Sequence, residues 1–394
     1  MNIKWPERKL SDISTMIDYR GKTPQKSTSG IPLITAKIVK NGTILPANEF
    51  IAESQYASWM TRGYPCVGDV VMTTEAPLGE VAQLHDAHVA LAQRIITIRG
   101  KKDVLDNGYL KYFLQSAEGQ GRLRARETGT TVTGIKAAEL RELMIPLPDI
   151  VQQRKISKVL LDLDEKIYNL TQENHNLEEQ AKALYDQIWN NYDSGTWSSA
   201  KAEDLFDISI GKTPPRKESQ WFSENDNDIV WVSIADMGQS GCFISNSSEY
   251  LTPDAVSKFN VKRVPVGAIL LSFKLTVGRV AITGCELTTN EAIAHFRMED
   301  STIREYLYFY LKHFNYQTMG STSSIATAVN SKMVKAMRID IPARETLENF
   351  HSTVFPMFEQ IKQNQQEIQT LAQLRDALLP KLMSGEIDVS EVEV

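Results

Sequence analysis

The chain repeats itself, and this duplication limits what it can fold into. Five short segments of the first half recur in the same order in the second half. The first-half segments are Tyr19-Arg-Gly-Lys-Thr-Pro24, Val67-Gly-Asp-Val-Val-Met72, Gly79-Glu-Val-Ala82, Tyr109-Leu-Lys-Tyr-Phe-Leu114 and Met144-Ile-Pro-Leu-Pro148. Their counterparts are Ser209-Ile-Gly-Lys-Thr-Pro214, Val266-Gly-Ala-Ile-Leu-Leu271, Gly278-Arg-Val-Ala281, Tyr306-Leu-Tyr-Phe-Tyr-Leu311 and Arg338-Ile-Asp-Ile-Pro342. The shared order predicts a tandem duplication of roughly 190 to 200 residues per copy.

Each copy contains short β-branched runs separated by turn residues, which is typical of strands. The expected strands include Ile31–Thr35, Asp69–Met72, Arg94–Ile98, Ile229–Ile234 and Ala268–Leu271. One helix is expected at Asp106–Ala117, and its counterpart at Ile303–Asn315. Each copy therefore predicts an α+β globular domain.

Each copy ends in a long helical pattern with apolar residues in strict 4-3 alternation, as in a coiled coil. Asp149 is the expected N-cap of the first helix, and Gly385 is expected to follow the end of the second. Antiparallel packing would place Asn174 opposite Asn364, a polar pair that fixes the register, with a pseudo-twofold axis near the middle. Pro356 and Pro380 are expected to kink or shorten the second helix. Two independent amphipathic helices are the alternative.

The expected organisation is therefore two tandem domains separated by two long helices that form one antiparallel coiled coil. The predicted ranges are a globular domain at 1–148, a central spacer helix at 149–192, a second globular domain at 193–342, a C-terminal spacer helix at 343–384 and an acidic tail at 385–394. Some 40 helical residues at about 1.5 Å each would make a spacer of about 60 Å.

The net charge of −6, taken for the whole chain, argues against a nucleic-acid partner. The distribution of the charges along the chain removes this objection. Residues 1–148 carry 19 basic and 15 acidic residues, and residues 193–342 carry 15 and 17. Residues 149–192 carry 5 and 8, and residues 343–394 carry 4 and 9. The acidity lies in the helices and the tail, so it does not exclude DNA as a ligand of the domains.

Catalytic and metal-binding motifs are missing from the sequence. Gly-Lys-Thr occurs twice, but a P-loop needs another glycine where Met16 and Phe206 stand. The three cysteines are far apart, and His85 and His88 have no ligand set around them. No signal peptide or run of 18 apolar residues occurs, so we expect a cytoplasmic protein without metal or cofactor of its own. The pattern favours a binding protein over an enzyme.

Polar residues that recur at equivalent points of the two copies are the candidate DNA contacts. Such positions offer hydroxyls and cations for phosphates and base edges. In the first copy they are Arg20, Lys22, Thr23, Lys26, Thr73, Thr74, Arg122, Arg124, Arg126, Thr130, Thr131 and Lys136. In the second copy they are Lys212, Thr213, Arg216, Lys217, Ser272, Lys274, Ser321, Thr322, Ser323 and Lys332.

Taken together, these features resemble the specificity subunit of type I restriction-modification enzymes over essentially the whole chain. The resemblance rests on the duplicated domain-and-helix plan, the two Val-Gly segments, Ile145-Pro-Leu-Pro148 leading into Gln152-Gln153, Leu163-Asp-Glu-Lys-Ile167, and the ending Leu374-Arg-Asp-Ala-Leu-Leu-Pro-Lys-Leu-Met-Ser-Gly-Glu-Ile387. The second copy departs from the pattern where its helix starts, at Ala343-Arg-Glu-Thr-Leu347.

The resemblance implies two target-recognition domains, each reading one half of a bipartite, asymmetric DNA site, and helices that set the spacing. It implies two methyltransferase subunits as partners, which carry S-adenosylmethionine, and restriction subunits that use ATP and Mg²⁺. A specificity subunit of a type IIB-like system is the related alternative. A P-loop-like phosphotransferase or NTPase and a protein-binding adaptor are the alternatives from other classes.

Overall fold

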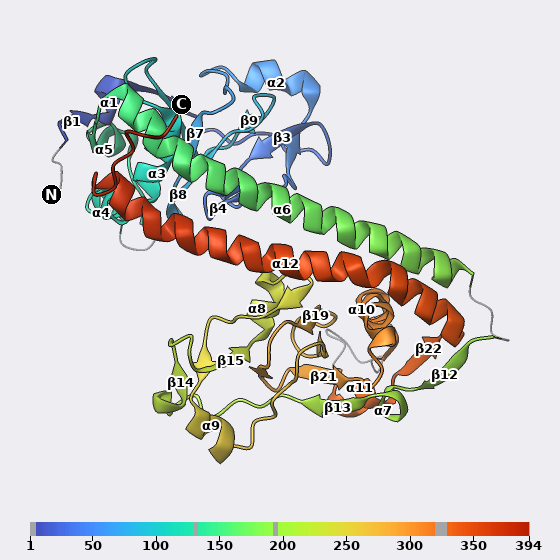
Figure 1. Ribbon diagram of the computed structural model, residues 1–394. Coiled ribbons are helices and arrows are strands. Elements are labelled where there is room, and N and C mark those ends of the chain that lie inside the picture. The colour runs from blue at the N-terminus through green and yellow to red at the C-terminus, as the bar shows by residue number, and fades with distance from the viewer. Residues whose placement is uncertain (1–4, 130–132, 192–195, 320–328, 394) are drawn as a thin grey trace. The chain divides into compact units, whose positions relative to one another are not determined.

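A computed structural model describes residues 5–129, 133–191, 196–319 and 329–393. The chain folds into two compact units, one of residues 1–167 and 370–394, the other of residues 168–369. Two long helices, α6 (Ile150–Asn190) and α12 (Arg344–Met383), each contribute a part to both units (Figure 1). The remaining elements form one α+β domain in each unit. No helix among the described residues is long and apolar enough to cross a membrane.

The first domain is built from short elements before α6. They are β1 (Glu7–Lys9), α1 (Leu10–Ile13), β2 (Ser14–Asp18), β3 (Ile31–Ile34), β4 (Val39–Lys40), β5 (Thr43–Ile44), β6 (Phe50–Ile51), α2 (Glu53–Trp59), β7 (Val70–Thr74), β8 (Leu78–Gln83), β9 (Ala90–Leu91), β10 (Ile95–Gly100), α3 (Asn107–Gln115), α4 (Ala117–Arg124), α5 (Ala137–Arg141) and β11 (Met144–Pro146).

The second domain lies between the long helices in the sequence. Its helical elements are α7 (Ala202–Leu205), η1 (Ser219–Trp221), α8 (Ile234–Gln239), α9 (Pro253–Lys258), η2 (Ser301–Ile303), α10 (Arg304–His313), η3 (Tyr316–Met319) and α11 (Ser331–Ala336). Its strands are β12 (Ser198–Lys201), β13 (Asp207–Ile210), β14 (Phe222–Ser223), β15 (Ile229–Val232), β16 (Phe243–Ile244), β17 (Tyr250–Leu251), β18 (Ile269–Ser272), β19 (Val280–Thr283), β20 (Thr288–Thr289), β21 (Ile293–Arg297) and β22 (Arg338–Ile341).

The sheets of the two domains share a strand order, with one further strand in each sheet of the second domain (β16 and β14), and this shared order confirms the predicted duplication. The main sheet runs β2-β10-β7-β8 in the first domain and β13-β21-β18-β19-β16 in the second. The smaller sheet is β6-β3-β9 in the first and β14-β17-β15-β20 in the second. In each domain a two-stranded sheet, β1-β11 or β12-β22, joins the first strand to the last.

The long helices pack antiparallel within each unit. In the second unit, Asn364 donates a hydrogen bond from Nδ2 to Oδ1 of Asn174 over 2.9 Å. In the first unit, Arg375 donates to Asp164, and Lys155 lies beside the backbone of Ser390. The earlier a residue stands in α6, the later its contact stands in α12 or in the segment after it, as antiparallel packing requires. The alternative of two independent helices is therefore wrong.

The ends of the helices follow from local chemistry. Gln152 donates its backbone N–H to Asp149 Oδ1 over 2.9 Å, so Asp149 is the N-cap of α6. Gly385 follows α12 with φ +70°, the left-handed geometry in which helices often end. The helix α12 continues past Pro356 and Pro380, so neither proline shortens it, and a kink at either one stays a prediction. Each proline removes one backbone hydrogen bond, and the packing of buried neighbours along the helix offsets that loss.

The end of the chain packs on the first unit. Val389 is buried, and Ile387 and Val392 pack against the same core cluster as Leu382. The segment expected to be only an acidic tail therefore has an apolar face, because its valines alternate with its acidic residues.

Replacing both Asn174 and Asn364 by Leu is expected to leave the helices intact and to loosen their register. The free energy of unfolding should stay unchanged or rise slightly, because a paired polar contact is exchanged for an apolar one. Cysteine crosslinking measures the alignment, with Leu177→Cys paired to a cysteine at position 361 or, one heptad away, at 354. A double variant that crosslinks only to position 361 would contradict this role of the asparagine pair.

Candidate nucleic-acid interface

One hairpin recurs in both domains with the same hydrogen bonds. In the first domain it joins β7 to β8, and Thr73 Oγ1 accepts the backbone N–H of Glu80 over 3.0 Å. In the second it joins β18 to β19, and Ser272 Oγ accepts the N–H of Arg279 over 3.0 Å. The hydroxyl at this position therefore closes the hairpin in both copies.

The Gly-Lys-Thr-Pro turn lies beside this hairpin region in both domains. Thr23 Oγ1 donates to Oε1 of Gln93 over 3.4 Å, and Thr213 Oγ1 donates to the carboxylate of Glu291. Gln93 and Glu291 hold equivalent positions, two residues after β9 and β20. Residues 22–30, all of them described, contain no helix. A P-loop places a helix directly after this motif, so the P-loop interpretation is wrong.

In the first domain the hairpin, the turn and the loop before α5 surround a polar cleft of about 330 Å³. Its walls are Arg20, Gly21, Thr74, Glu75, Gln93, Arg94, Thr128, Gly134, Ile135 and Lys136. Three predicted contacts, Arg20, Thr74 and Lys136, meet here although they are far apart in the sequence. Gln93 and Arg94 are not among the predicted contacts, because they follow the buried strand β9 without any motif. Arg94 pairs with Glu75 over 3.0 Å across this cleft.

The cations of the first turn are partly engaged with the protein. Arg20 forms a bidentate pair with Asp18 and donates from Nη1 to the carbonyl of Ile135 over 2.9 Å. Lys26 pairs with Glu49 over 2.8 Å. Lys22 and Lys136 are exposed. Arg20 is thus a fixed guanidinium that ties the turn to the loop before α5, whereas the two lysines are accessible to a phosphate.

Three predicted contacts are buried hydroxyls. Thr73 and Ser272 close their hairpins, and Thr74 Oγ1 hydrogen-bonds the carbonyl of Arg94 over 3.2 Å. Their hydroxyls are occupied within the sheets, so in this conformation these side chains support the hairpins and are not presented to DNA. Strands β7 and β18 are buried along their whole length, on both faces, which a polar composition does not reveal.

The arginines of the expected cluster at 122, 124 and 126 do not share one surface. Arg122 donates to Glu7, to Glu118 and to the carbonyl of Met144, so it joins α4 to β1 and β11. Arg126 pairs with Glu139 of α5 over 3.2 Å. Arg124 is exposed and lines a separate cavity with Gln120 and Asp376. Arg122 and Arg126 therefore act as ties within the domain, and Arg124 is the accessible member.

In the second domain, Arg216 stacks over two aromatic rings, with its guanidinium 4.3 Å from the centre of Phe222 and 4.5 Å from that of Trp231. It also pairs with Glu249 over 2.8 Å. Lys212 donates to the carbonyl of Phe259 over 2.6 Å, while Lys217 is exposed. Stacking holds Arg216 in one orientation, a common arrangement where a guanidinium binds an anion.

Lys274 and Arg216 lie near Glu291. Burial alone would raise the pKa of Glu291. Hydrogen bonds from Thr213 and from the backbone, together with the charges of Lys274 and Arg216, outweigh burial, so the pKa lies below its usual value. Glu291 is therefore ionised and organises the cations of the turn and the hairpin. Lys332 is an exposed residue of α11. Thr130, Thr131, Ser321, Thr322 and Ser323 lie outside the described residues.

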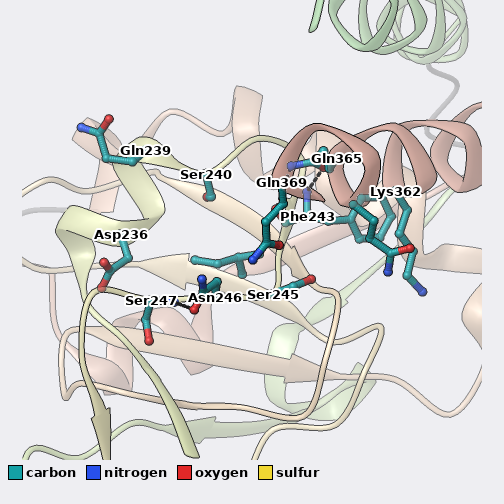
Figure 2. Close-up of a pocket in the computed structure, with 12 residues that line it drawn as sticks. Asp236, Gln239, Ser240, Phe243, Ser245, Asn246, Ser247, Lys362, Gln365 and Gln369 are labelled. Atoms are coloured by element: carbon teal, nitrogen blue, oxygen red, sulfur yellow. Dashed lines mark hydrogen bonds between the residues drawn. The ribbon is translucent and has the colours of Figure 1, made fainter. Parts of the chain in front are cut away.

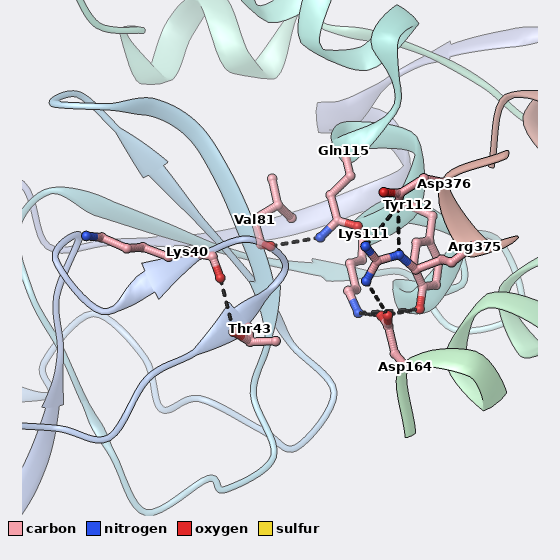
Figure 3. A network of polar contacts seen from close by, with 9 residues as sticks. All are labelled: Lys40, Thr43, Val81, Lys111, Tyr112, Gln115, Asp164, Arg375 and Asp376. Carbon is pink, nitrogen blue, oxygen red and sulfur yellow. Dashed lines mark hydrogen bonds and ion pairs between the residues drawn. The ribbon is translucent and has the colours of Figure 1, made fainter. Parts of the chain in front are cut away.

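Two other polar sites join the domains to the long helices. In the first unit, Asp164 of α6 accepts hydrogen bonds from Lys111 and Tyr112 of α3 and from Arg375 of α12 (Figure 3). In the second, a pocket of about 300 Å³ lies between α8, β16 and α12 (Figure 2). There Gln365 bonds both backbone groups of Phe243, at 3.0 and 3.1 Å. These contacts fix each domain on its helix, and within the described ranges no cluster of side chains could hold a metal.

Comparison with known proteins decides the family. Residues 2–179 and 194–373 each match the model of the type I restriction modification DNA specificity domain. The chain belongs to this family. The two matches also fall on the two copies seen in the sequence and in the sheets, so the family's domain is the repeated unit of this chain.

Similar proteins match between about half and nearly all of the chain. The type I restriction enzyme MjaIX specificity subunit of Methanocaldococcus jannaschii is 27% identical, over 98% of this chain and 94% of its own length. The HindI specificity subunit of Haemophilus influenzae is 28% identical over 48% of this chain and 42% of its own length. The fold is similar to the crystal structure of a type I restriction-modification S subunit from M. genitalium, with a TM-score of 0.59 and 17% identity, over 97% of this chain and 96% of that one. The P-loop enzyme and the adaptor find no support among these relatives.

Proposed function

We propose that each domain of this specificity subunit reads one half of a bipartite, asymmetric DNA site. The observation that carries this is a common frame with different side chains. The two hairpins share their closing hydrogen bond, yet Glu75 and Ala76 in the first domain stand where Lys274 and Leu275 stand in the second. Equal frames with unequal surfaces suit two readers that recognise different bases.

The long helices set the distance between the half-sites in this proposal and dock two methyltransferase subunits. Their acidic character supports a protein partner over DNA along this part of the chain, since phosphates repel carboxylates. The methyltransferase subunits would carry S-adenosylmethionine, and restriction subunits using ATP and Mg²⁺ would complete the complex. A type IIB-like assembly would use the same subunit with other partners.

The subunit itself is non-catalytic in this proposal. Among the described residues, Ser209 Oγ lies 3.0 Å from Nδ1 of His295, an arrangement that invites a catalytic interpretation. His295 is fully buried, and its Nε2 faces the hydroxyl of Thr289 at 2.7 Å, where a catalytic triad has a carboxylate. Burial, with the charge of Arg297, lowers the pKa of His295 to about 3. This histidine is a neutral part of the sheet and too weak a base for proton transfer at neutral pH.

Single-molecule sequencing of methylated DNA tests the proposed function. The chain would be expressed with its methyltransferase subunit in a host that lacks other modification systems. We expect one motif made of two different defined halves separated by an undefined gap. A continuous or palindromic motif, or no methylation by an intact complex, would overturn the proposal.

Single lysine variants should change the salt dependence of DNA binding. Replacing exposed Lys136 or Lys217 by Ala is expected to reduce the slope of log K against log salt by about 1, because one phosphate contact is lost. Titrations of the complex on its own duplex at several salt concentrations measure this. Lys102→Ala is the matched control. Lys102 is exposed and follows β10, whereas Arg94, which lines the cleft, precedes that strand. A slope unchanged in both variants, or lowered equally by the control, would count against these contacts.

A further inference from the structure

The tip of the β18–β19 hairpin carries an exposed leucine in a strained backbone conformation. Leu275 is 96% exposed and has φ +59°. A single exposed leucine needs no explanation by itself. A left-handed backbone does, because residues with a Cβ are disfavoured there and glycine or asparagine is the usual choice.

The strained backbone conformation is common to the hairpins of both domains, whereas the large apolar side chain occurs only in the second. In the first domain the equivalent residue is Ala76, which also has a left-handed backbone, with φ +51°. Both residues stand three positions before a glycine with positive φ, Gly79 or Gly278. The frame therefore forces this backbone in both copies, and the second copy places a large apolar side chain on it.

The hairpin holds Leu275 firmly on the surface. Ser272 Oγ donates to the carbonyl of Thr276 over 2.5 Å and accepts the N–H of Arg279. The backbone N–H of Gly278 also donates to the carbonyl of Ser272 over 2.9 Å. Phe273, two residues before the leucine, is buried in the core of the unit. Leu275 is thus held in place, and its exposure does not come from a loose loop.

The charges around the tip indicate what it meets. Lys274 precedes the leucine. Phe273 donates its N–H to the carbonyl of Ala292 over 2.9 Å, and the neighbouring Glu291 accepts a hydrogen bond from Thr213, so the turn that carries Arg216 lies beside the hairpin. Lys212 and Lys217 lie in the same turn as Arg216 and are exposed. An exposed apolar side chain beside Lys274, on a hairpin that adjoins a cationic turn, suits a polyanion whose interior is apolar, as in DNA, where stacked bases lie between phosphates.

We propose that Leu275 is an apolar specificity contact that the second domain makes to the bases of its half-site. This inference rests on the proposed function, since it presumes that the second domain binds DNA. The lysines and Arg216 hold the phosphates, and the strained hairpin presents the leucine to the base edges, where a thymine methyl group is its natural partner. In the first domain the corresponding residue is Ala76, whose small side chain contributes almost nothing to the choice between bases.

The test compares Leu275→Ala and Leu275→Gly with Val266→Ala in the complex with the methyltransferase. Val266 is another exposed apolar residue, 54% exposed, and it lies three residues before the first residue of β18, at the end of the strand away from Leu275. We expect the leucine variants to lose preference at one position of one half-motif and to methylate the original site at least tenfold more slowly. Leu275→Gly should also raise the midpoint of thermal unfolding, because glycine relieves the strain. Val266→Ala should change neither the motif nor the rate.

The outcomes separate the two proposals. No bipartite motif from the unmodified complex would overturn the proposed function. A normal motif that Leu275→Ala and Leu275→Gly leave unchanged, at rates within twofold, would overturn this inference alone. Weaker assembly with the methyltransferase at unchanged DNA binding would assign Leu275 to a protein contact and would overturn it as well.

Discussion

Replacing Asp164 by Ala is expected to lower the free energy of unfolding of the first unit by about 3–5 kcal/mol, the usual cost of breaking a buried ion pair from one side. Asp164 accepts hydrogen bonds from Lys111 Nζ at 2.6 Å, from the Tyr112 hydroxyl at 2.6 Å and from Arg375 Nη1 at 2.9 Å. The Lys111 side chain is only 6% exposed. Without the carboxylate, its charge would remain in the interior with no counter-ion.

The same network should make the stability depend on pH. Burial alone would raise the pKa of Asp164, but the charge of Lys111 and the hydrogen bonds from Arg375, Lys111 and Tyr112 outweigh it, so the pKa is lowered. A carboxyl with a lower pKa in the folded state stabilises the protein above its unfolded pKa, near 3.9, and loses that contribution as pH falls through the folded pKa. The difference between the parent protein and Asp164→Ala should therefore shrink towards acid pH.

Asp162→Ala is the matched control for this prediction. Asp162 lies two residues earlier on α6 and pairs with Lys158 over 3.0 Å at the surface, so its loss should cost no more than about 0.5 kcal/mol. Hydrogen exchange of the α3 amides, followed as urea is raised, reports the stability of this unit. Equal protection in the two variants at neutral pH would show that the Asp164 network adds nothing beyond a surface pair.

The architecture was predictable because its signals are local in the sequence. The 4-3 spacing of apolar residues fixes a face on each helix, and the antiparallel alignment followed from two asparagines that now prove to be hydrogen-bonded. The same alignment places Leu163 of α6 opposite Arg375 of α12, a charged residue at a position where an apolar one is expected. The structure explains it, because Arg375 reaches past that position to the carboxylate of Asp164.

The candidate site was less predictable, since composition does not show which polar groups are already used. Arg122 looked like part of a basic surface, yet two carboxylates and a carbonyl occupy it. Ser272 looked accessible, yet it closes a hairpin. Leu275 carried no signal at all, because its importance lies in a backbone angle and in cations brought from a distant turn. Whether the predicted contacts touch DNA stays a prediction.

The two units have different contacts at equivalent positions of their long helices. Asp164 stands 14 residues after the first residue of α6, and Phe358 stands 14 residues after the first residue of α12. Where the first unit has its charged network, the second has Phe358 packed edge to face on Tyr308 and Phe309, with ring centres 5.5 and 5.8 Å apart. Phe243 adds a third ring at 6.3 Å. Phe358 is fully buried, so apolar packing forms a large part of the joint between α10 and α12 in the second unit (Figure 1), beside the contacts of Glu305 with His351 and of Arg304 with Glu359.

Phe358→Ala is therefore expected to cost the second unit about 3–5 kcal/mol, through lost transfer energy and the cavity that remains. Unlike the Asp164 effect, this loss should not change between neutral and acid pH, because no ionisable group is removed. Phe355→Ala is the matched control, three residues earlier on α12, where the ring is 39% exposed and a loss of at most about 1 kcal/mol is expected. Hydrogen exchange of the α10 amides measures both variants. A loss that grows or shrinks with pH as in Asp164→Ala, or equal losses at positions 355 and 358, would show that the aromatic cluster does not hold this joint.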